Sequence, residues 1–317
     1  MQLTRLQGVF VPMLTPIDAD ERVDESSLRR LTDFLIDAGV HGLWAMGTTG
    51  EFAAFPETER ARAITATVDQ TRGRVPVIGN IGDSSTGLAL RHARHAASAG
   101  VDALALTPPH YYPHSMDEML IHFRAVKEAF PDLPLLIYNI PQTVKVKMTV
   151  PTTLQLAREG TAQGIKDSQN DLKWFRQLVQ GIRADSLEDR FRLFLGTRVL
   201  IDAGALIGAH GAIPATANVA PAAAAEAWEA ATSGDYRLAE RAQEIVGQYE
   251  DLSTIAKGGS PDAASYSSMK AILREWGVVD SVQLTRPLRG FNDAELTELR
   301  ARVATLPHGG KRVAVAA

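Results

Sequence analysis

The sequence predicts an α/β fold, a (β/α)8 TIM barrel that carries a C-terminal appendage of three helices. A short apolar run, a turn and an amphipathic helix follow one another eight times, which is the number of units in a closed parallel barrel. The runs are continuously apolar, as in Leu135-Leu136-Ile137, a pattern typical of strands buried on both faces. A length of 317 residues suits such a barrel with additions. A doubly wound open sheet is the structural alternative.

Each strand is expected at an apolar run that ends in turn residues, and each helix at the amphipathic segment that follows it. The expected strands cover 8–16, 42–49, 75–82, 103–109, 133–141, 162–168, 191–196 and 211–218. The expected helices cover 24–38, 56–72, 86–99, 115–129, 150–159, 171–182, 198–207 and 221–233.

Residues at the helix ends support these boundaries. Asp24 and Ser115 stand where N-caps are expected, and the acidic Glu118 lies in the first turn after Ser115. Gly39 and Gly100 follow the ends of two helices, where glycine readily adopts the left-handed conformation.

The pattern divides the chain into a barrel and a smaller helical part. Residues 1–234 are expected to form the barrel and to carry the active site. Apolar strand runs then stop, and helices are expected at 236–255, 263–276 and 293–306, within a C-terminal helical region of 235–306. The last residues, 307–317, are expected to be a disordered tail.

Composition excludes several classes of protein. A hydrophobic content of 45% supports a large core, and a net charge of −4 gives no electrostatic reason to bind nucleic acid or a membrane surface. The absence of cysteine excludes disulfides and thiolate metal sites. The first residues lack the apolar stretch of a signal peptide, and the alanine-rich segment 202–231 is too interrupted for a membrane span. We therefore expect a cytoplasmic protein.

Lys166 ends the sixth expected strand, in Gly164-Ile165-Lys166-Asp167-Ser168. In a TIM barrel the active site lies at the C-terminal ends of the strands. A lysine amine buried there loses proton affinity and can add to a ketone, whereas a lone lysine at a strand end is ordinarily a solvated surface residue. The turns Gly47-Thr48-Thr49-Gly50-Glu51 and Tyr138-Asn139-Ile140-Pro141 end two other strands and favour the catalytic interpretation.

The sequence contains no motif for a metal, a serine nucleophile or a phosphate. His-Glu-x-x-His, Gly-x-Ser-x-Gly and a complete phosphate-binding glycine loop are all missing. His110 and His114 share one loop but have no acidic partner at a suitable spacing. We expect no metal and no cofactor.

Four motifs together resemble a known family. They are Gly47-Thr48-Thr49-Gly50-Glu51, Tyr138-Asn139-Ile140-Pro141, Gly164-Ile165-Lys166-Asp167 and Gly208-Ala209-His210-Gly211-Ala212-Ile213. With these four motifs in this order, the chain resembles the dihydrodipicolinate synthase / N-acetylneuraminate lyase superfamily. Its members are the class I, Schiff-base-forming pyruvate aldolases and dehydratases. The likeness extends from Val11-Pro12-Met13-Leu14-Thr15-Pro16 through the helical appendage.

The resemblance implies roles for nine residues. Lys166 matches the Schiff-base lysine, Tyr138 the proton-shuttling tyrosine, and Thr48 the hydroxyl that links it into a relay. Tyr111 matches a tyrosine that reaches into a neighbouring subunit's site, which implies a homotetramer built as a dimer of dimers. The substrate-binding positions would be Thr49 for the pyruvyl carboxylate, Ile213 and Ser168 near the lysine, and Thr143 and Arg198 toward the rest of the substrate.

The proposed chemistry explains these residue types. A neutral lysine adds to the 2-keto carbon, and the resulting iminium stabilises the enamine left by carbon–carbon cleavage or proton loss. A phenol moves protons without bringing a permanent charge into the pocket. Taken singly, a tyrosine at a strand end usually packs with a solvated hydroxyl, and Gly-Thr-Thr-Gly usually forms a tight turn.

Departures from the family subtypes bear on the substrate. Dihydrodipicolinate synthases usually carry an arginine where this chain has Thr143. N-acetylneuraminate lyases usually have Gly-Ser-Thr-Gly-Glu at the first turn and acidic residues after strand seven, where this chain has Thr48 and Thr197-Arg198-Val199. The sequence therefore favours a lyase acting on 2-keto acids, an aldolase or dehydratase of 2-keto-3-deoxy sugar acids. Two interpretations of Arg198 and Lys145 stay open. Each would pair with a distal carboxylate of the substrate, or each is a solvated surface charge.

Four alternatives are weighed at this stage. Within the superfamily they are dihydrodipicolinate synthase and N-acetylneuraminate lyase. From a different class, a non-catalytic barrel paralogue would explain the fold but not the joint presence of Lys166, Tyr138, Thr48 and Tyr111. A phosphate-binding barrel enzyme would need a glycine-rich loop after strand seven or eight, whereas Gly208-Ala209-His210-Gly211 precedes strand eight.

Overall fold

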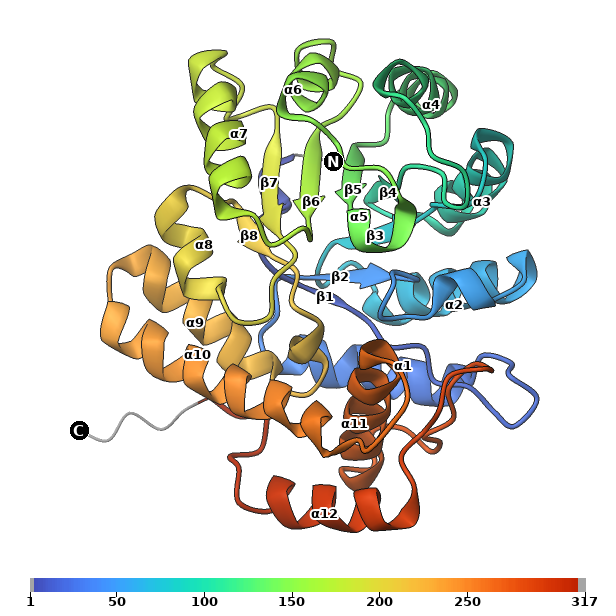
Figure 1. The fold of residues 1–317 in the computed structure, drawn as a ribbon, viewed down its shortest axis with the longest axis vertical. Coiled ribbons are helices and arrows are strands. Elements are labelled where there is room, and N and C mark those ends of the chain that lie inside the picture. The colour runs from blue at the N-terminus through green and yellow to red at the C-terminus, as the bar shows by residue number, and fades with distance from the viewer. Residues whose placement is uncertain (1–2, 313–317) are drawn as a thin grey trace.

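The computed structural model describes residues 3–312 and shows a closed barrel of eight parallel strands (Figure 1). Each strand pairs with its neighbours in sequence, and β1 pairs with β8 to close the ring. The predicted (β/α)8 barrel is therefore confirmed. The strands are β1 Gly8–Pro12, β2 Gly42–Ala45, β3 Val77–Asn80, β4 Ala103–Leu106, β5 Leu135–Asn139, β6 Gly164–Asp167, β7 Arg192–Leu195 and β8 Gly211–Ala212.

The eight ring helices lie between or after these strands. They are α1 Glu25–Asp37, α2 Glu57–Thr71, α3 Thr86–Ala99, α4 Met116–Ala129, α6 Val150–Arg158, α7 Leu172–Ala184, α8 Ile201–Ile207 and α9 Pro221–Ser233. Asp24 and Ser115 cap α1 and α4 through their side chains, and Ser115 forms a reciprocal capping box with Glu118. Gly100 ends α3 with a φ of 85°.

The interior of the barrel is packed rather than hollow. Alternate residues of the strands point inward and form one buried apolar cluster, which includes Phe10, Trp44, Leu136 and Phe194. Because side chains alternate along a strand, Tyr138 follows Leu136 onto the same inner face. It pairs in register with Lys166 on the neighbouring strand. The strand period therefore places both side chains above the same filled core.

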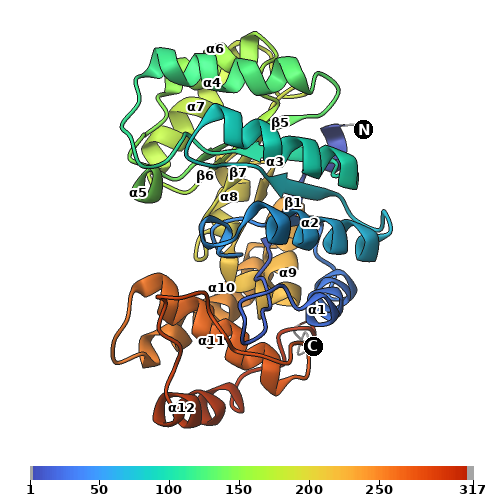
Figure 2. The same ribbon diagram turned by 90° about the vertical axis from the view of Figure 1, so that its right-hand side faces the viewer.

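The C-terminal region consists of α10 Tyr236–Glu250, the short helix η4 Asp251–Ile255, α11 Pro261–Glu275 and α12 Asp293–Val303. Two views show α11 and α12 at the opposite end of the molecule from α4 and α6 (Figures 1 and 2). The segment expected as one helix over 236–255 changes from α-helix to 3-10 helix after Glu250.

Residues 307–312 differ from the expected disordered tail. The Pro307 carbonyl accepts a hydrogen bond from Tyr249, and the His308 ring stacks on Trp276 at 4.3 Å between centroids. The Gly309 carbonyl accepts from the Ala222 amide, and Arg312 pairs with Glu229. These contacts hold the segment against α9, α10 and the residue that follows α11, which corrects the prediction for 307–312. Residues 313–317 lie outside the described part of the chain.

The eighth strand is shorter than expected. Ladder pairing stops after Ala212, and a 3-10 helix η3 at Ala215–Asn218 replaces the rest of the expected strand over 211–218. Pro214 has no amide hydrogen to donate, so it ends the ladder. The Asn218 side chain then accepts from the Leu14 amide and donates to the Pro12 carbonyl, which fixes this segment to β1.

One further helix was not expected. The four-residue α5 Pro141–Val144 follows β5 directly, with proline at its first position, where no amide hydrogen is needed. Within residues 3–312, no helix is both long and apolar enough to cross a membrane.

Candidate active site

A cavity of about 460 Å³ opens at the C-terminal ends of the strands. This is the end where TIM barrels carry their active sites. Eight of the nine residues expected at the site line this cavity, and Tyr111 does not. The eight are Thr48, Thr49, Tyr138, Thr143, Lys166, Ser168, Arg198 and Ile213.

Lys166 is buried at the floor of the cavity, with 4% of its surface exposed. Its Nζ atom lies 4.3 Å from the centroid of the Tyr138 ring and 5.0 Å from that of Trp44. Burial, reinforced by the positive charge of Arg198, lowers the pKa of Lys166 to about 7. A large fraction of the amine is therefore uncharged near neutral pH and able to act as a nucleophile.

Tyr138 connects Lys166 with Thr48. Its hydroxyl lies 3.3 Å from Lys166 Nζ and 3.0 Å from Thr48 Oγ1. Burial raises the pKa of Tyr138 to about 12, although hydrogen bonds from Thr48 and Ser168 act in the opposite direction. The phenol is therefore neutral at physiological pH, and a proton can pass between an atom bound at Lys166 and Thr48 through it.

Thr48 lies on a tight turn whose glycines allow close backbone approach. The Gly50 amide donates to the Gly47 carbonyl, and Glu51 adopts a left-handed conformation with a φ of 59°. The backbone N–H groups of Thr48 and Thr49 donate to no acceptor among residues 3–312. Two unpaired amides on such a turn, in residues that line the cavity, are suited to a carboxylate.

The turn is held from the C-terminal region, which the sequence did not indicate. The Glu51 carboxylate accepts a hydrogen bond from Lys270 Nζ at 2.6 Å, and from the amide and hydroxyl of Thr285 at 2.7 Å each. Glu51 and Lys270 are both buried. The ion pair therefore connects α11 with the turn that carries Thr48.

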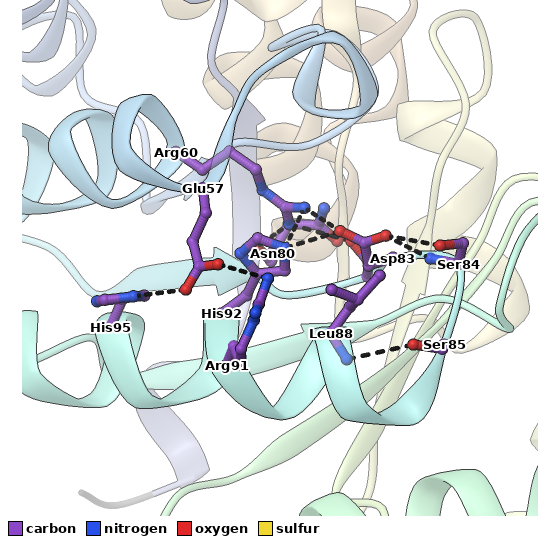
Figure 3. A network of polar contacts seen from close by, with 11 residues as sticks. Glu57, Arg60, Asn80, Asp83, Ser84, Ser85, Leu88, Arg91, His92 and His95 are labelled. Atoms are coloured by element: carbon purple, nitrogen blue, oxygen red, sulfur yellow. Dashed lines mark hydrogen bonds and ion pairs between the residues drawn. The ribbon is translucent and has the colours of Figure 1, made fainter.

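A second polar network holds the segment that follows the turn (Figure 3). Arg60 of α2 lies 3.2 Å from the Asp83 carboxylate and 2.9 Å from His92 Nε2 of α3, and its guanidinium stacks on Phe52. Burial lowers the pKa of Arg60 to about 10, although the charges of Asp83 and Glu57 oppose that change. At the centre of this network, Arg60, Asp83 and His92 do not line the cavity, so their contribution is to hold α2 against the β3–α3 loop.

Space around Lys166 depends on one glycine. A Cβ atom at Gly196 would lie 2.0 Å from Ser168 Oγ and 3.0 Å from Lys166 Cε. A larger residue there would displace both side chains. Ile213 lines the cavity next to this glycine, because its amide donates to the carbonyl of Leu195, the residue before Gly196, at 2.7 Å.

Arg198 and Thr143 are in the lining but already have partners. Arg198 donates to Glu250 of α10, whose other oxygen accepts a hydrogen bond from Thr216 at 2.6 Å. Thr143 donates to the Ile140 carbonyl at 3.1 Å. Sequence reasoning missed several lining residues, because three of them come from the C-terminal region and one from the unexpected α5: Glu250, Asp262, Tyr266 and Gln142.

Tyr111 lies outside the cavity of its own chain. It is 69% exposed, has a φ of 88°, and packs edge-on against Tyr112. Lys145 donates to its carbonyl at 3.0 Å. A single chain therefore does not bring Tyr111 together with Lys166. Across residues 3–312, no group of three or more His, Cys, Asp and Glu side chains is arranged to hold a metal ion.

Comparison with known proteins identifies the family. The sequence model of the dihydrodipicolinate synthetase family matches residues 5–306, nearly the whole chain. The chain belongs to this family. It is therefore a lyase of the class I, Schiff-base-forming aldolase superfamily, as the sequence motifs predicted.

Individual relatives of this family member cover most of its length. An uncharacterized DapA-like lyase of Halobacterium salinarum is 35% identical over 301 residues, 95% of this chain and 94% of the relative. The 4-hydroxy-tetrahydrodipicolinate synthase of Laribacter hongkongensis is 36% identical over 248 residues, 78% of this chain and 83% of that enzyme. The structure of dihydrodipicolinate synthase from Bacteroides thetaiotaomicron superposes with a TM-score of 0.87 at 28% identity, covering 95% and 99% of the two chains.

Proposed function

We propose that this family member is an aldolase or dehydratase of 2-keto-3-deoxy sugar acids and that Lys166 forms the Schiff base. The observation that carries the proposal is the contact between Lys166 Nζ and the Tyr138 hydroxyl at 3.3 Å, in a site where burial lowers the pKa of the lysine to about 7. An amine that is partly neutral beside a neutral phenol is the arrangement that imine formation requires.

The first step is addition of the amine to the keto group. The Lys166 nitrogen bonds to C2, and the former keto oxygen takes a proton to give a carbinolamine. The hydroxyl then leaves as water and the iminium remains. Tyr138 supplies and recovers these protons, and Thr48, 3.0 Å from the phenol, passes them on. The amides of Thr48 and Thr49 bind the substrate carboxylate next to C2.

The second step uses the iminium as an electron acceptor. For cleavage, the C4 hydroxyl loses its proton, the bond between C3 and C4 breaks, and its electron pair moves into the enamine. An aldehyde leaves first, and hydrolysis after protonation at C3 releases pyruvate. Dehydration instead begins with loss of a C3 proton, which gives the enamine of the intact carbon chain. The enamine electron pair then expels the C4 hydroxyl, which takes a proton and leaves as water. Both routes need Lys166 and Tyr138, and both keep the iminium nitrogen as the electron sink.

Two features of the cavity favour a sugar-acid chain over aspartate semialdehyde. Thr143 offers a hydroxyl where a second substrate carboxylate would need an arginine, and Arg198 already pairs with Glu250. Dihydrodipicolinate synthesis is the second candidate, because the Laribacter hongkongensis relative carries that name.

Trapping and product analysis test the proposal. Borohydride added with pyruvate should reduce an imine, attach a pyruvate-derived mass to the peptide that contains Lys166, and leave Lys166→Ala unlabelled. A panel of 2-keto acids, followed for released pyruvate and for loss of water, should then give the highest kcat/KM with a 2-keto-3-deoxy sugar acid. Labelling at another residue would reject the role of Lys166, and preference for aspartate semialdehyde with pyruvate would reject the substrate class.

A further inference from the structure

Helix α11 of the C-terminal region forms part of the cavity wall. Asp262 in its first turn and Tyr266 one turn later both line the cavity that contains Lys166. Residues four apart lie on the same helix face, so the two side chains are neighbours. Thr48, Thr49 and Lys166 account for C1 and C2 of a bound 2-keto acid. The part of the cavity wall that α11 forms is therefore available to the remaining carbon atoms of the substrate.

Tyr266 has an unused hydroxyl in this wall. The residue is 4% exposed, and its hydroxyl makes no hydrogen bond within residues 3–312. The oxygen is not among the fully buried atoms that lack a partner, so it is accessible from the cavity and free to bond to a ligand there. Burial, with a contribution from the negative charge of Asp262, raises the pKa of Tyr266. The phenol is therefore neutral and can donate or accept a hydrogen bond.

Asp262 adds a free acceptor beside it. Its carboxylate has no hydrogen bond or ion pair to any residue from 3 to 312, and the residue is exposed and lines the cavity. Arg198, the cation of this part of the described lining, is neutralised by Glu250. Together Arg198, Glu250 and Asp262 leave one net negative charge. A second carboxylate on a substrate would be repelled here, whereas hydroxyl groups would be bound as donors to Asp262.

From this wall we infer that Asp262 and Tyr266 form the specificity subsite for a neutral, polyhydroxylated chain, so that the preferred 2-keto-3-deoxy acid ends in a hydroxymethyl group. This inference rests on the proposed function. The Asp262 carboxylate accepts hydrogen bonds from one or two hydroxyl groups of the substrate. The Tyr266 hydroxyl forms a hydrogen bond with a neighbouring oxygen of the substrate. Neither residue takes part in imine formation.

The test compares two six-carbon 2-keto-3-deoxy acids, one ending in a hydroxymethyl group and one in a carboxylate. For the hydroxymethyl substrate, Asp262→Asn should lower kcat/KM roughly 10- to 150-fold, the range of a charge-assisted hydrogen bond. Tyr266→Phe should lower it roughly 2- to 10-fold. Asp262→Asn should also shift the preference toward the carboxylate-ended acid, because the repelling charge is gone. Asp251→Asn removes the same charge outside the cavity lining and should change neither value.

Deuterium exchange at C3 of pyruvate separates the subsite from the core chemistry. This exchange needs Lys166, its proton carriers Tyr138 and Thr48, and the pyruvyl-binding groups, but no contact with the sugar chain. Asp262→Asn and Tyr266→Phe should therefore change the exchange rate far less than they change kcat/KM for the hydroxymethyl substrate. Equal kcat/KM in parent and variants would overturn the subsite, and so would a parallel loss of exchange. A parent that exchanges C3 protons but turns over neither sugar acid would reject the proposed function, whereas parental turnover that both variants leave unchanged rejects only the subsite.

Discussion

Lys270 Nζ lies 2.6 Å from Glu51 Oε1, and each side chain is 1% exposed. The two residues are 219 positions apart, on α11 and on the turn that carries Thr48. Glu51 also accepts two hydrogen bonds from Thr285, so three donors of the C-terminal region meet on one carboxylate. The C-terminal region is thus attached to the catalytic turn through a buried, fully paired charge.

Lys270→Met should destabilise the protein and lower kcat. Removing one partner of a buried ion pair leaves the other charge unpaired and costs about 3–5 kcal/mol. The Thr48 turn would also lose its anchor. Urea unfolding measures the first effect and turnover the second. Lys147→Met is the control, because the Lys147–Asp171 pair is half-exposed at 3.5 Å and such pairs contribute about 0–1 kcal/mol. An unchanged unfolding free energy in Lys270→Met would contradict the assigned role.

Tyr138→Phe should preserve the fold and reduce turnover. The ring remains packed against Trp44 at 5.3 Å between centroids, but the hydroxyl next to Lys166 is lost. General acid–base groups contribute roughly 10²- to 10⁴-fold, so kcat should fall within that range. Thr48→Val keeps the side-chain volume, breaks the contact with Tyr138, and should also lower kcat. Circular dichroism checks the fold. Parental turnover in Tyr138→Phe would make the phenol a packing residue.

Lys166→Met should stabilise the protein, most strongly at low pH. The pKa of Lys166 is about 7 when folded, against about 10.4 for an unfolded lysine. Between these values the unfolded state binds the extra proton, so the parent gains stability as pH rises. Below pH 7 both states are protonated and the folded state carries the whole cost of the buried charge, on the order of a few kcal/mol. Thermal unfolding at pH 6 and pH 9 should show a larger advantage of Lys166→Met at pH 6; a constant difference would exclude the pKa shift.

The strand pattern explains why much of the site could be predicted. A period of two residues places Tyr138 on the same inner face as Leu136, and parallel register places it beside Lys166. Both placements can be inferred from the sequence, because each apolar run marks a strand and parallel strands end at the same rim of the barrel. The tight turn at Thr48 is likewise local, since its glycines and hydrogen bonds lie within a few residues.

The missed features depend on contacts between distant segments. The helical pattern of 263–276 indicates which residues are apolar, but not that Tyr266 and Lys270 face the barrel. In the sequence, Arg198 has no acidic residue near it in its loop, which indicates an unpaired charge. Its partner Glu250 lies 52 positions away. The expected strand over 211–218 was too long because an apolar run cannot show that η3 follows Pro214.

Tyr111 should act in a neighbouring subunit's site. It is exposed next to Tyr112 and lies outside its own cavity, and the family resemblance implies a homotetramer. Sedimentation should therefore show a tetramer rather than an active monomer. Tyr111→Phe and Lys166→Ala should each have low activity alone. Mixed subunits should regain activity, because a site with Lys166 then receives Tyr111 from the Lys166→Ala subunit. Absence of recovery in verified hybrids would place Tyr111 in its own chain's site or outside catalysis.

Dihydrodipicolinate synthase activity should be low, and lysine should not inhibit the protein. Condensing pyruvate with aspartate semialdehyde brings a second carboxylate into the cavity, and a bidentate arginine binds that group better than the Thr143 hydroxyl does. A charge-assisted hydrogen bond contributes about 1.5–3 kcal/mol, so its absence should cost roughly 10- to 150-fold in kcat/KM. Arg198 is a poor substitute, because it already pairs with Glu250.

Thr143→Arg tests whether the missing arginine is the cause of low dihydrodipicolinate synthase activity. Thr143 is exposed in the cavity lining, so a guanidinium can be accommodated there. The variant should raise kcat/KM for aspartate semialdehyde, while Thr143→Lys, which adds the charge without the bidentate geometry, should raise it less. The deuterium exchange of pyruvate should stay at the parental rate in both variants, since C1 and C2 are bound elsewhere. Efficient condensation by the parent protein would show that this chain recognises the second carboxylate without an arginine at position 143.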